Sequence, residues 1–236
     1  MLERLLKPLH RWVWSDAHRR ARKLLTFAQT EADGSRDISR AAELTRDPSL
    51  RRLYLRHAED ESRHARLFRD RGRALLRSLP RSAAGGEANW LSPGERGLDG
   101  VGVEGESAET LLAFLHLSEK AAARRFALYL EVLDCDIDTR DVFAQVLSDE
   151  AFHMTYTRKQ LARVSPRKQG LRLWQARAAR LWKAYLRAAS ALASVIGHAV
   201  LLVQYFVLLP PFALFARREP EGFQPARPAP PLRGQY

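Results

Sequence analysis

Apolar side chains recur at intervals of three and four residues through four long stretches between residues 15 and 165. This spacing places them on one helix face, as expected of helices with one buried side. A stretch rich in Gly, Ser and Glu, at about residues 78–108, separates the first two stretches from the last two. We therefore predict an all-α fold, a four-helix bundle whose two helical hairpins are joined by a long crossover. The predicted inward stripes are Leu24, Ala28 and Glu31; Leu50, Tyr54, His57, Glu61, His64 and Phe68; Leu112, Leu115, Glu119, Ala123 and Phe126; and Phe143, Val146, Glu150, His153, Thr157 and Leu161.

The motif Asp-Glu-x-x-His occurs twice on these stripes, at residues 60–64 and again 89 residues later at 149–153. The Glu and His of each copy are three residues apart, so they share a helix face. A further inward Glu precedes each copy, Glu31 in the first half and Glu119 in the second. A buried carboxylate needs a positive partner, either Arg or Lys or a metal ion. Because carboxylate and imidazole groups suit first-row transition metals, we predict that each hairpin supplies half of a two-metal site.

This duplicated pattern over residues 15–162 resembles the ferritin-like di-iron carboxylate superfamily, which includes rubrerythrins, ubiquinone-biosynthesis hydroxylases and fatty-aldehyde deformylating oxygenases. The resemblance implies two iron ions, with Glu61 and Glu150 as bridging carboxylates; the same ligand types also bind manganese, so a Mn or mixed Mn/Fe centre stays open. The chain lacks the Cys-rich domain of a full-length rubrerythrin, since it has a single cysteine. The implied metal ligands are Glu31, Glu61, His64, Glu119, Glu150 and His153.

Two aspartates are predicted to orient the ligand histidines. Metal-bound imidazoles usually donate their second N–H to a carboxylate or carbonyl oxygen. Antiparallel helices facing each other would let Asp60 hold His153 and Asp149 hold His64, whereas the alternative is that both are ordinary boundary residues. Four further side chains near the motifs are interpreted as core residues, with a role as extra ligand, proton relay or redox group as the alternative: Tyr54, His57, His116 and Tyr156.

The C-terminal third of the chain has a different pattern. Residues 188–216 contain no Asp, Glu, Lys or Arg, and the first 22 of them are long enough to cross a bilayer. A basic amphipathic helix with aromatic residues is predicted at 166–187, and a disordered Pro-rich tail at 217–236. We predict that residues 188–216 associate with a membrane and that Pro210 and Pro211 end or sharply bend the helix. The alternative is a soluble fifth helix, buried in the bundle or in a homodimer interface.

Composition adds a basic surface and a compartment. The chain carries 39 Lys and Arg against 27 Asp and Glu, for a net charge of +12. Because the basic residues are dispersed and no nucleic-acid motif is present, we expect no nucleic acid partner and attribute the charge to solvation or to attraction by anionic lipid. Residues 1–14 predict a short amphipathic segment, not a signal peptide. The lone Cys135 fits a reducing compartment, so the metal domain is expected on the cytoplasmic face of a membrane, with a soluble cytoplasmic protein as the alternative.

These features predict a membrane-associated di-iron oxygenase or oxidase that activates O₂ to oxidise a lipophilic substrate, such as a lipid, fatty aldehyde, quinone or isoprenoid. The sequence does not indicate the electron donor. The alternative is a ferroxidase or a rubrerythrin-like protein that removes peroxide or handles iron. A third hypothesis is a helical membrane scaffold without catalysis, and the complete set of six ligands argues against it.

Overall fold

The computed structural model describes residues 7–79, 102–134 and 136–216, and these residues are helical with no β-strand among them. The prediction of an all-α fold is confirmed. Contacts divide the chain into one compact unit up to Ala179 and a second from Arg180 on, which are described separately. The predicted crossover and tail lie largely outside the described residues, as do the first six residues and Cys135. The elements are α2 (Lys7–Ser15), α3 (Ala17–Leu44), α4 (Pro48–Ser78), η3 (Val103–Gly105), α5 (Ala108–Leu130), α6 (Ile137–Val164), α7 (Gln169–Val203), the π-helical η4 (Gln204–Leu208) and α8 (Leu209–Ala216).

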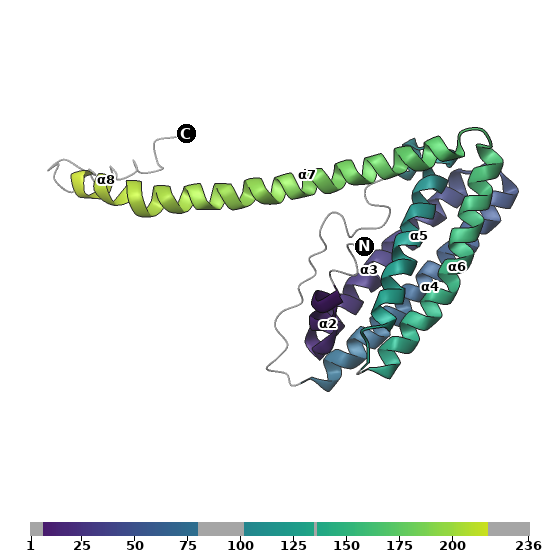
Figure 1. Ribbon diagram of the computed structural model, residues 1–236, viewed down its shortest axis with the longest axis horizontal. Helices are drawn as coiled ribbons and strands as arrows, with labels where there is room; N and C mark the ends of the chain where they lie inside the picture. The colour runs from purple at the N-terminus through teal and green to yellow at the C-terminus, as the bar shows by residue number, and fades with distance from the viewer. Residues whose placement is uncertain (1–6, 80–101, 135, 217–236) are drawn as a thin grey trace, which may run out of the picture. The chain divides into compact units, whose positions relative to one another are not determined.

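Helices α3 to α6 lie side by side in the first unit (Figure 1). The pairs α3–α4 and α5–α6 are the two predicted hairpins, and they meet through α4 and α6. Each helix begins at a polar residue whose side chain accepts a hydrogen bond from a free backbone N–H of the first turn. These N-cap residues are Asp16, Asp47, Ser107 and Asp136.

The inward stripes form two apolar clusters. One contains Tyr54, Leu112 and Leu161, and the other contains Phe68 and Phe143 together with their neighbours. Along all four helices, the predicted metal-binding side chains lie in sequence between residues of one cluster and residues of the other. The polar centre is therefore enclosed at both ends by hydrocarbon.

Helix α2 packs on the first unit through Trp14, which is buried against Phe27, Tyr129 and Phe143. Trp12, on the same helix, is exposed and lies against the guanidinium of Arg19. Trp14 thus attaches this short helix to the bundle.

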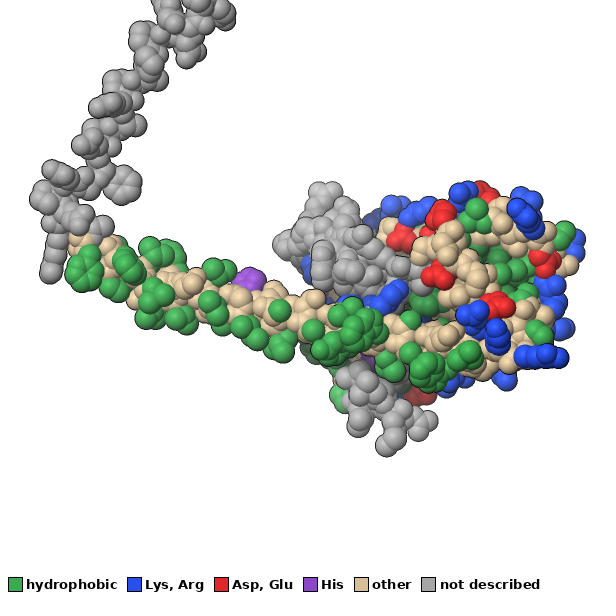
Figure 2. Space-filling model, turned by 90° about the horizontal axis from the view of Figure 1, so that it is seen from above, with side chains coloured by type: hydrophobic (Ala, Val, Ile, Leu, Met, Phe, Trp, Pro, Cys, Tyr) green, Lys and Arg blue, Asp and Glu red, His purple; other side chains and the backbone are tan. Residues whose placement is uncertain are grey.

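The second unit contains most of a helical stretch, Gln169–Phe215, which is long and apolar enough to cross a membrane by length and composition. Its apolar side chains are exposed, for example Val195, Phe206 and Phe212, and Figure 2 shows such side chains along the helix. The helix does not end at Pro210 and Pro211 but continues to Ala216. The π-helical turn immediately before the prolines widens the backbone where they remove hydrogen-bond donors.

Gly72 sets the distance between α3 and α4. A methyl group at Gly72 would lie 3.0 Å from Leu25 Cγ and 3.2 Å from the Ala21 carbonyl oxygen. Replacing Gly72 with alanine should therefore lower the free energy of unfolding by about 1–2 kcal/mol, because crowding outweighs the gain in helix propensity. Urea denaturation followed by circular dichroism would measure it. Gly34→Ala is the matched control: its methyl group would lie 3.8 Å from Glu61 Oε2, an ordinary contact. It should leave the metal-free protein equally or more stable, and equal effects of the two substitutions would contradict the tight contact.

Candidate metal centre

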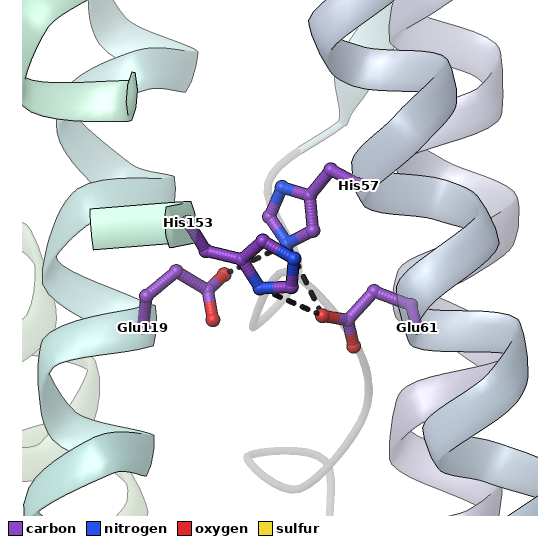
Figure 3. Close-up of side chains that lie close together, drawn as sticks. All are labelled: His57, Glu61, Glu119 and His153. Atoms are coloured by element: carbon purple, nitrogen blue, oxygen red, sulfur yellow. Dashed lines mark hydrogen bonds and ion pairs between the residues drawn. The ribbon is translucent and has the colours of Figure 1, made fainter. Parts of the chain in front are cut away.

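Carboxylates and imidazoles from four helices converge between the two apolar clusters. The three-residue group consists of Glu31 from α3 with Glu61 and His64 from α4. The four-residue group consists of His57 and Glu61 from α4, Glu119 from α5 and His153 from α6, and Figure 3 shows these side chains pointing toward one another. Within each group, one ligand atom from every residue lies within 4.8 Å of the others. Glu61 belongs to both groups, so its carboxylate lies where the two groups meet.

The structure brings together five of the six predicted ligands in these groups, and the sixth, Glu150, lies beside them. Glu150 is only 1 % exposed, and its Oε2 lies 3.8 Å from His153 Nδ1. Its carboxyl group also interacts with that of Glu119. Glu150 is a member of neither group, so its role as a bridging ligand stays a prediction.

Both ligand histidines contact the aspartate predicted for them. His64 Nε2 lies 3.1 Å from Asp149 Oδ2, and His153 Nε2 lies 3.3 Å from Asp60 Oδ2. These contacts cross between the hairpins, because each copy of the motif supplies the aspartate for the histidine of the other copy. An imidazole that donates Nε2–H to a carboxylate presents Nδ1 as a lone pair.

The unsatisfied atoms of the centre fit a metal ion. Within the part of the chain that the structure describes, Nδ1 of His64 and Nδ1 of His153 are buried without a hydrogen-bond partner, and so is Oε2 of Glu150. Buried polar atoms in proteins are nearly always paired. Here the three unpaired atoms are an imidazole lone pair on each side and a carboxylate oxygen, which are the donors that iron, manganese and zinc accept. The residues present therefore fit a bound metal.

The electrostatics of the metal-free centre lead to the same conclusion. Burial raises the pKa of Glu61 and Glu119 well above the usual range, and nearby carboxyl groups add to the effect. Burial, with repulsion from Glu61, likewise raises the pKa of Glu31, and burial raises the pKa of Glu150 to about 8. Burial lowers the pKa of His64 to about 4, so this imidazole is neutral as a ligand must be. Without a cation, the four carboxyl groups cannot all ionise at neutral pH.

The sequence pattern does not decide whether His57 is a core residue or an additional ligand of the metal centre. It is fully buried, with Nε2 3.1 Å from Glu61 Oε1 and 3.5 Å from Glu119 Oε1. Its Nδ1 lies 2.7 Å from the Tyr156 hydroxyl. The position 89 residues later holds Val146, so the second half has no counterpart. The duplicated motif thus encloses an asymmetric centre, in which the four-residue group offers two imidazoles and the three-residue group one.

No family model, curated protein or solved structure matches the chain. The geometry of its own residues is therefore the basis for the functional proposals below.

Arg63 joins the two orienting aspartates, a role that the sequence does not signal. Its Nη2 lies 2.6 Å from Asp60 Oδ1 and 3.0 Å from Asp149 Oδ2. Burial tends to raise the pKa of Asp149, but the hydrogen bonds from His64 and Arg63 outweigh it and leave the pKa below its usual value. Arg63 thereby favours the ionised form of Asp149 and links the two aspartates that contact the histidines.

Replacing Arg63 with alanine is expected to weaken metal binding by about 3- to 10-fold. Loss of a residue that directly orients a metal-bound histidine typically weakens metal binding by about 10- to 100-fold. Arg63 contacts the aspartates and not the histidines, and its side chain is half-exposed, so a smaller effect is expected. Titration calorimetry with Co²⁺ would measure the change. Arg66→Ala is the control, because the one hydrogen bond of the Arg66 side chain to a described residue goes to the hydroxyl of Ser62 on the exposed side of the same helix. Equal Co²⁺ affinities of the two variants would show that Arg63 does not contribute to metal binding.

The metal-free protein is expected to lose stability as the pH rises from about 6.5 to 8.5. A carboxyl group whose pKa is raised on folding contributes stability that is complete below its unfolded pKa and disappears as the pH rises through its folded pKa. Glu150, with a pKa of about 8, titrates in this window. The lowered pKa of His64 opposes the trend only below about 6.5, where the unfolded imidazole takes up its proton. The slope should be at least about 1 kcal/mol per pH unit from Glu150 alone, and the raised pKa values of Glu31, Glu61 and Glu119 make it steeper.

Thermal unfolding of the chelated protein across this range would measure the slope. The metal-loaded protein should show a flatter or opposite dependence, because bound cations hold the carboxylates ionised and deprotonation then favours binding. A metal-free melting temperature that rises with pH over the same window would contradict the raised pKa values.

Proposed function

We propose that the protein is a membrane-associated di-iron oxidoreductase of the ferritin-like type, which activates O₂ to oxidise a lipophilic substrate. The observation that carries the proposal is the sharing of Glu61 between two ligand groups contributed by four helices. A single structural metal site would need only one such group, and a chance cluster of buried acids would not leave two oriented imidazoles with free Nδ1 atoms.

Two bound ferrous ions would supply the electrons that reduce O₂, with manganese as an alternative occupant. The protein's part is to hold and shield the centre. Glu31 and His64 would hold one ion, Glu119 and His153 the other, and Glu61 would lie between them. The apolar clusters on both sides limit water, so that the reaction takes place in a low-dielectric enclosure.

The apolar helix supports a substrate that partitions into lipid. An exposed apolar stretch of this length is expected to insert into a bilayer, which would hold the metal-bearing unit at the membrane surface. We place that unit on the cytoplasmic side, because ferrous iron requires a reducing compartment. Purified membranes washed with alkaline carbonate should retain the protein, and its release into the soluble fraction would remove the membrane part of the proposal.

Metal content and oxygen reactivity test the enzymatic part. The full-length chain in lipid nanodiscs would be loaded anaerobically with Fe²⁺, its iron counted, and its absorption followed after addition of O₂. Two irons per chain and an oxygen-dependent change in absorption are expected, and Glu119→Gln should reduce both. Glu59→Gln, an exposed neighbour of the centre on α4, should change neither. Two irons without reaction with O₂ would leave a metal-binding protein and overturn the oxidoreductase, whereas one iron or none would overturn the di-metal centre.

A further inference from the structure

A second polar site lies on the surface of the first unit, where α5, α6 and the start of α7 meet. It is an open depression of about 510 Å³. Its polar walls come from Lys120 on α5, Arg158 and Lys159 on α6 and Gln169 at the first position of α7, and His116 forms part of its lining. The volume falls within the range of small-molecule sites, so there is room for a group larger than a single ion.

The depression carries unbalanced positive charge. None of the described residues that line it is an Asp or a Glu. Among the described residues, Lys120, Arg158 and Lys159 form no hydrogen bond or ion pair, unlike Arg172 nearby on α7, which binds Glu109 at 2.7 Å. Cations gathered in a concave surface reinforce one another's potential and attract an anion more strongly than the same charges dispersed over a convex one.

His116 reports how closely these charges converge. It is 8 % exposed, and its Nδ1 lies 3.1 Å from the Met154 carbonyl oxygen, which fixes the ring at the lining of the depression. Burial lowers the pKa of His116, and repulsion from Lys120, Arg158 and Arg177 lowers it further. The positive groups are thus near enough to act on one buried ring, as they would on a bound ligand.

We propose that this depression binds the phosphate group of an anionic ligand. Lys120, Arg158 and Lys159 supply the charge, and the amide of Gln169 supplies a neutral donor. A phosphate group suits the site best, since it has enough oxygen atoms to accept bonds from an Arg fork and two Lys ammonium groups at once. The anion could be free in solution or be the head group of an acidic lipid.

The site is independent of the metal centre but lies on the same helical turns. His116 is one turn before Glu119 on α5. Met154, which also lines the depression, directly follows His153 on α6. An anionic ligand would therefore dock within about one helical turn of Glu119 and His153, two members of the four-residue group. Nothing in the proposal requires a metal to be bound.

Titration calorimetry on the full-length chain in phosphatidylcholine nanodiscs would test the site with two probes, inorganic phosphate and the soluble short-chain lipid dihexanoyl phosphatidic acid. The double variant Lys120→Gln/Arg158→Gln should bind the preferred probe at least about tenfold more weakly, because it loses two charge-assisted bonds. Arg124→Gln/Arg140→Gln is the matched control: it removes two exposed charges from the same two helices, outside the depression, and should change affinity by less than about twofold.

Binding of phosphate by the native chain would identify a free anion as the ligand. Binding of phosphatidic acid alone would identify a lipid head group. Either outcome supports the site, provided that the two double variants differ in affinity as expected. Lys159→Gln alters an exposed side chain that has no hydrogen bond or ion pair to a described residue, so it should leave the fold intact and weaken binding by about threefold. Failure of both probes to bind, or equal weakening in both double variants, would overturn the proposal, because the charge would then act only as a diffuse surface potential.

Discussion

Replacing Glu61 with glutamine is expected to abolish high-affinity binding of both metal ions. Glu61 is the one residue that belongs to the three-residue group and to the four-residue group. Glutamine has nearly the same size but lacks the negative charge, so both ions lose an anionic oxygen ligand at once. Loss of a residue that only orients a metal ligand lowers metal affinity by about 10- to 100-fold. Loss of the shared ligand itself should therefore lower the affinity for each ion by more than about 100-fold.

The substitution should leave the metal-free fold intact. Burial raises the pKa of Glu61 well above its usual value, so that the carboxyl group is largely neutral in the metal-free protein and glutamine imitates its protonated form. Urea denaturation in the presence of a chelator should therefore give the same midpoint for Glu61→Gln and the native chain. A large loss of stability would mean that Glu61 is ionised and paired in the metal-free state.

His57→Asn makes the measurement more specific. His57 belongs only to the four-residue group, so its loss should lower the affinity for one ion and leave the other ion bound. Co²⁺ titrations that show two sites in the native chain, one tight site in His57→Asn and none in Glu61→Gln would establish the shared carboxylate. If Glu61→Gln retained one ion at native affinity, the two groups would not share a ligand.

The sequence pattern predicts the helical fold and much of this centre because both depend on local spacing. Three- and four-residue periodicity identifies the buried faces, and Glu61 and His64 share such a face in any regular helix. The pairing of Asp60 with His153 follows from the repeat as soon as two copies face each other in opposite directions, and the structure contains that contact.

Other features depend on the register between helices, which periodicity does not determine. His57 lies on the predicted stripe, but only the relative placement of α4, α5 and α6 decides that its Nε2 faces Glu61 and Glu119. Arg63 reaches both aspartates for the same reason, although nothing in the motif distinguishes it from its neighbouring arginines. The basic depression combines residues from three helices, so in the sequence its cations are part of a generally basic surface.

Asp136 is expected to be the most sensitive position for stability outside the metal centre. Its side chain caps α6 by accepting hydrogen bonds from the backbone N–H and the hydroxyl of Thr139. It also pairs with Arg71 from α4 and lies 3.2 Å from Arg20 Nε of α3. The side chains of Asp136 and Arg20 are 5 % and 10 % exposed, so this network is removed from water. One carboxylate therefore joins three of the four bundle helices.

Replacing Asp136 with alanine should lower the free energy of unfolding by about 3–5 kcal/mol, because removal of one partner from a buried ion-pair network leaves the other charges uncompensated. Asp136→Asn keeps an acceptor for the helix cap and should cost less. Asp138→Ala is the control: Asp138 pairs with the same Arg71 at 2.9 Å, but its side chain is 69 % exposed, and such pairs contribute at most about 1 kcal/mol. Urea denaturation of the three variants, metal-free and in the same nanodiscs, would rank them. If Asp136→Ala and Asp138→Ala were equally stable, the position of Asp136 at the junction of α3, α4 and α6 would have no energetic role, and the bundle would depend on its apolar clusters alone.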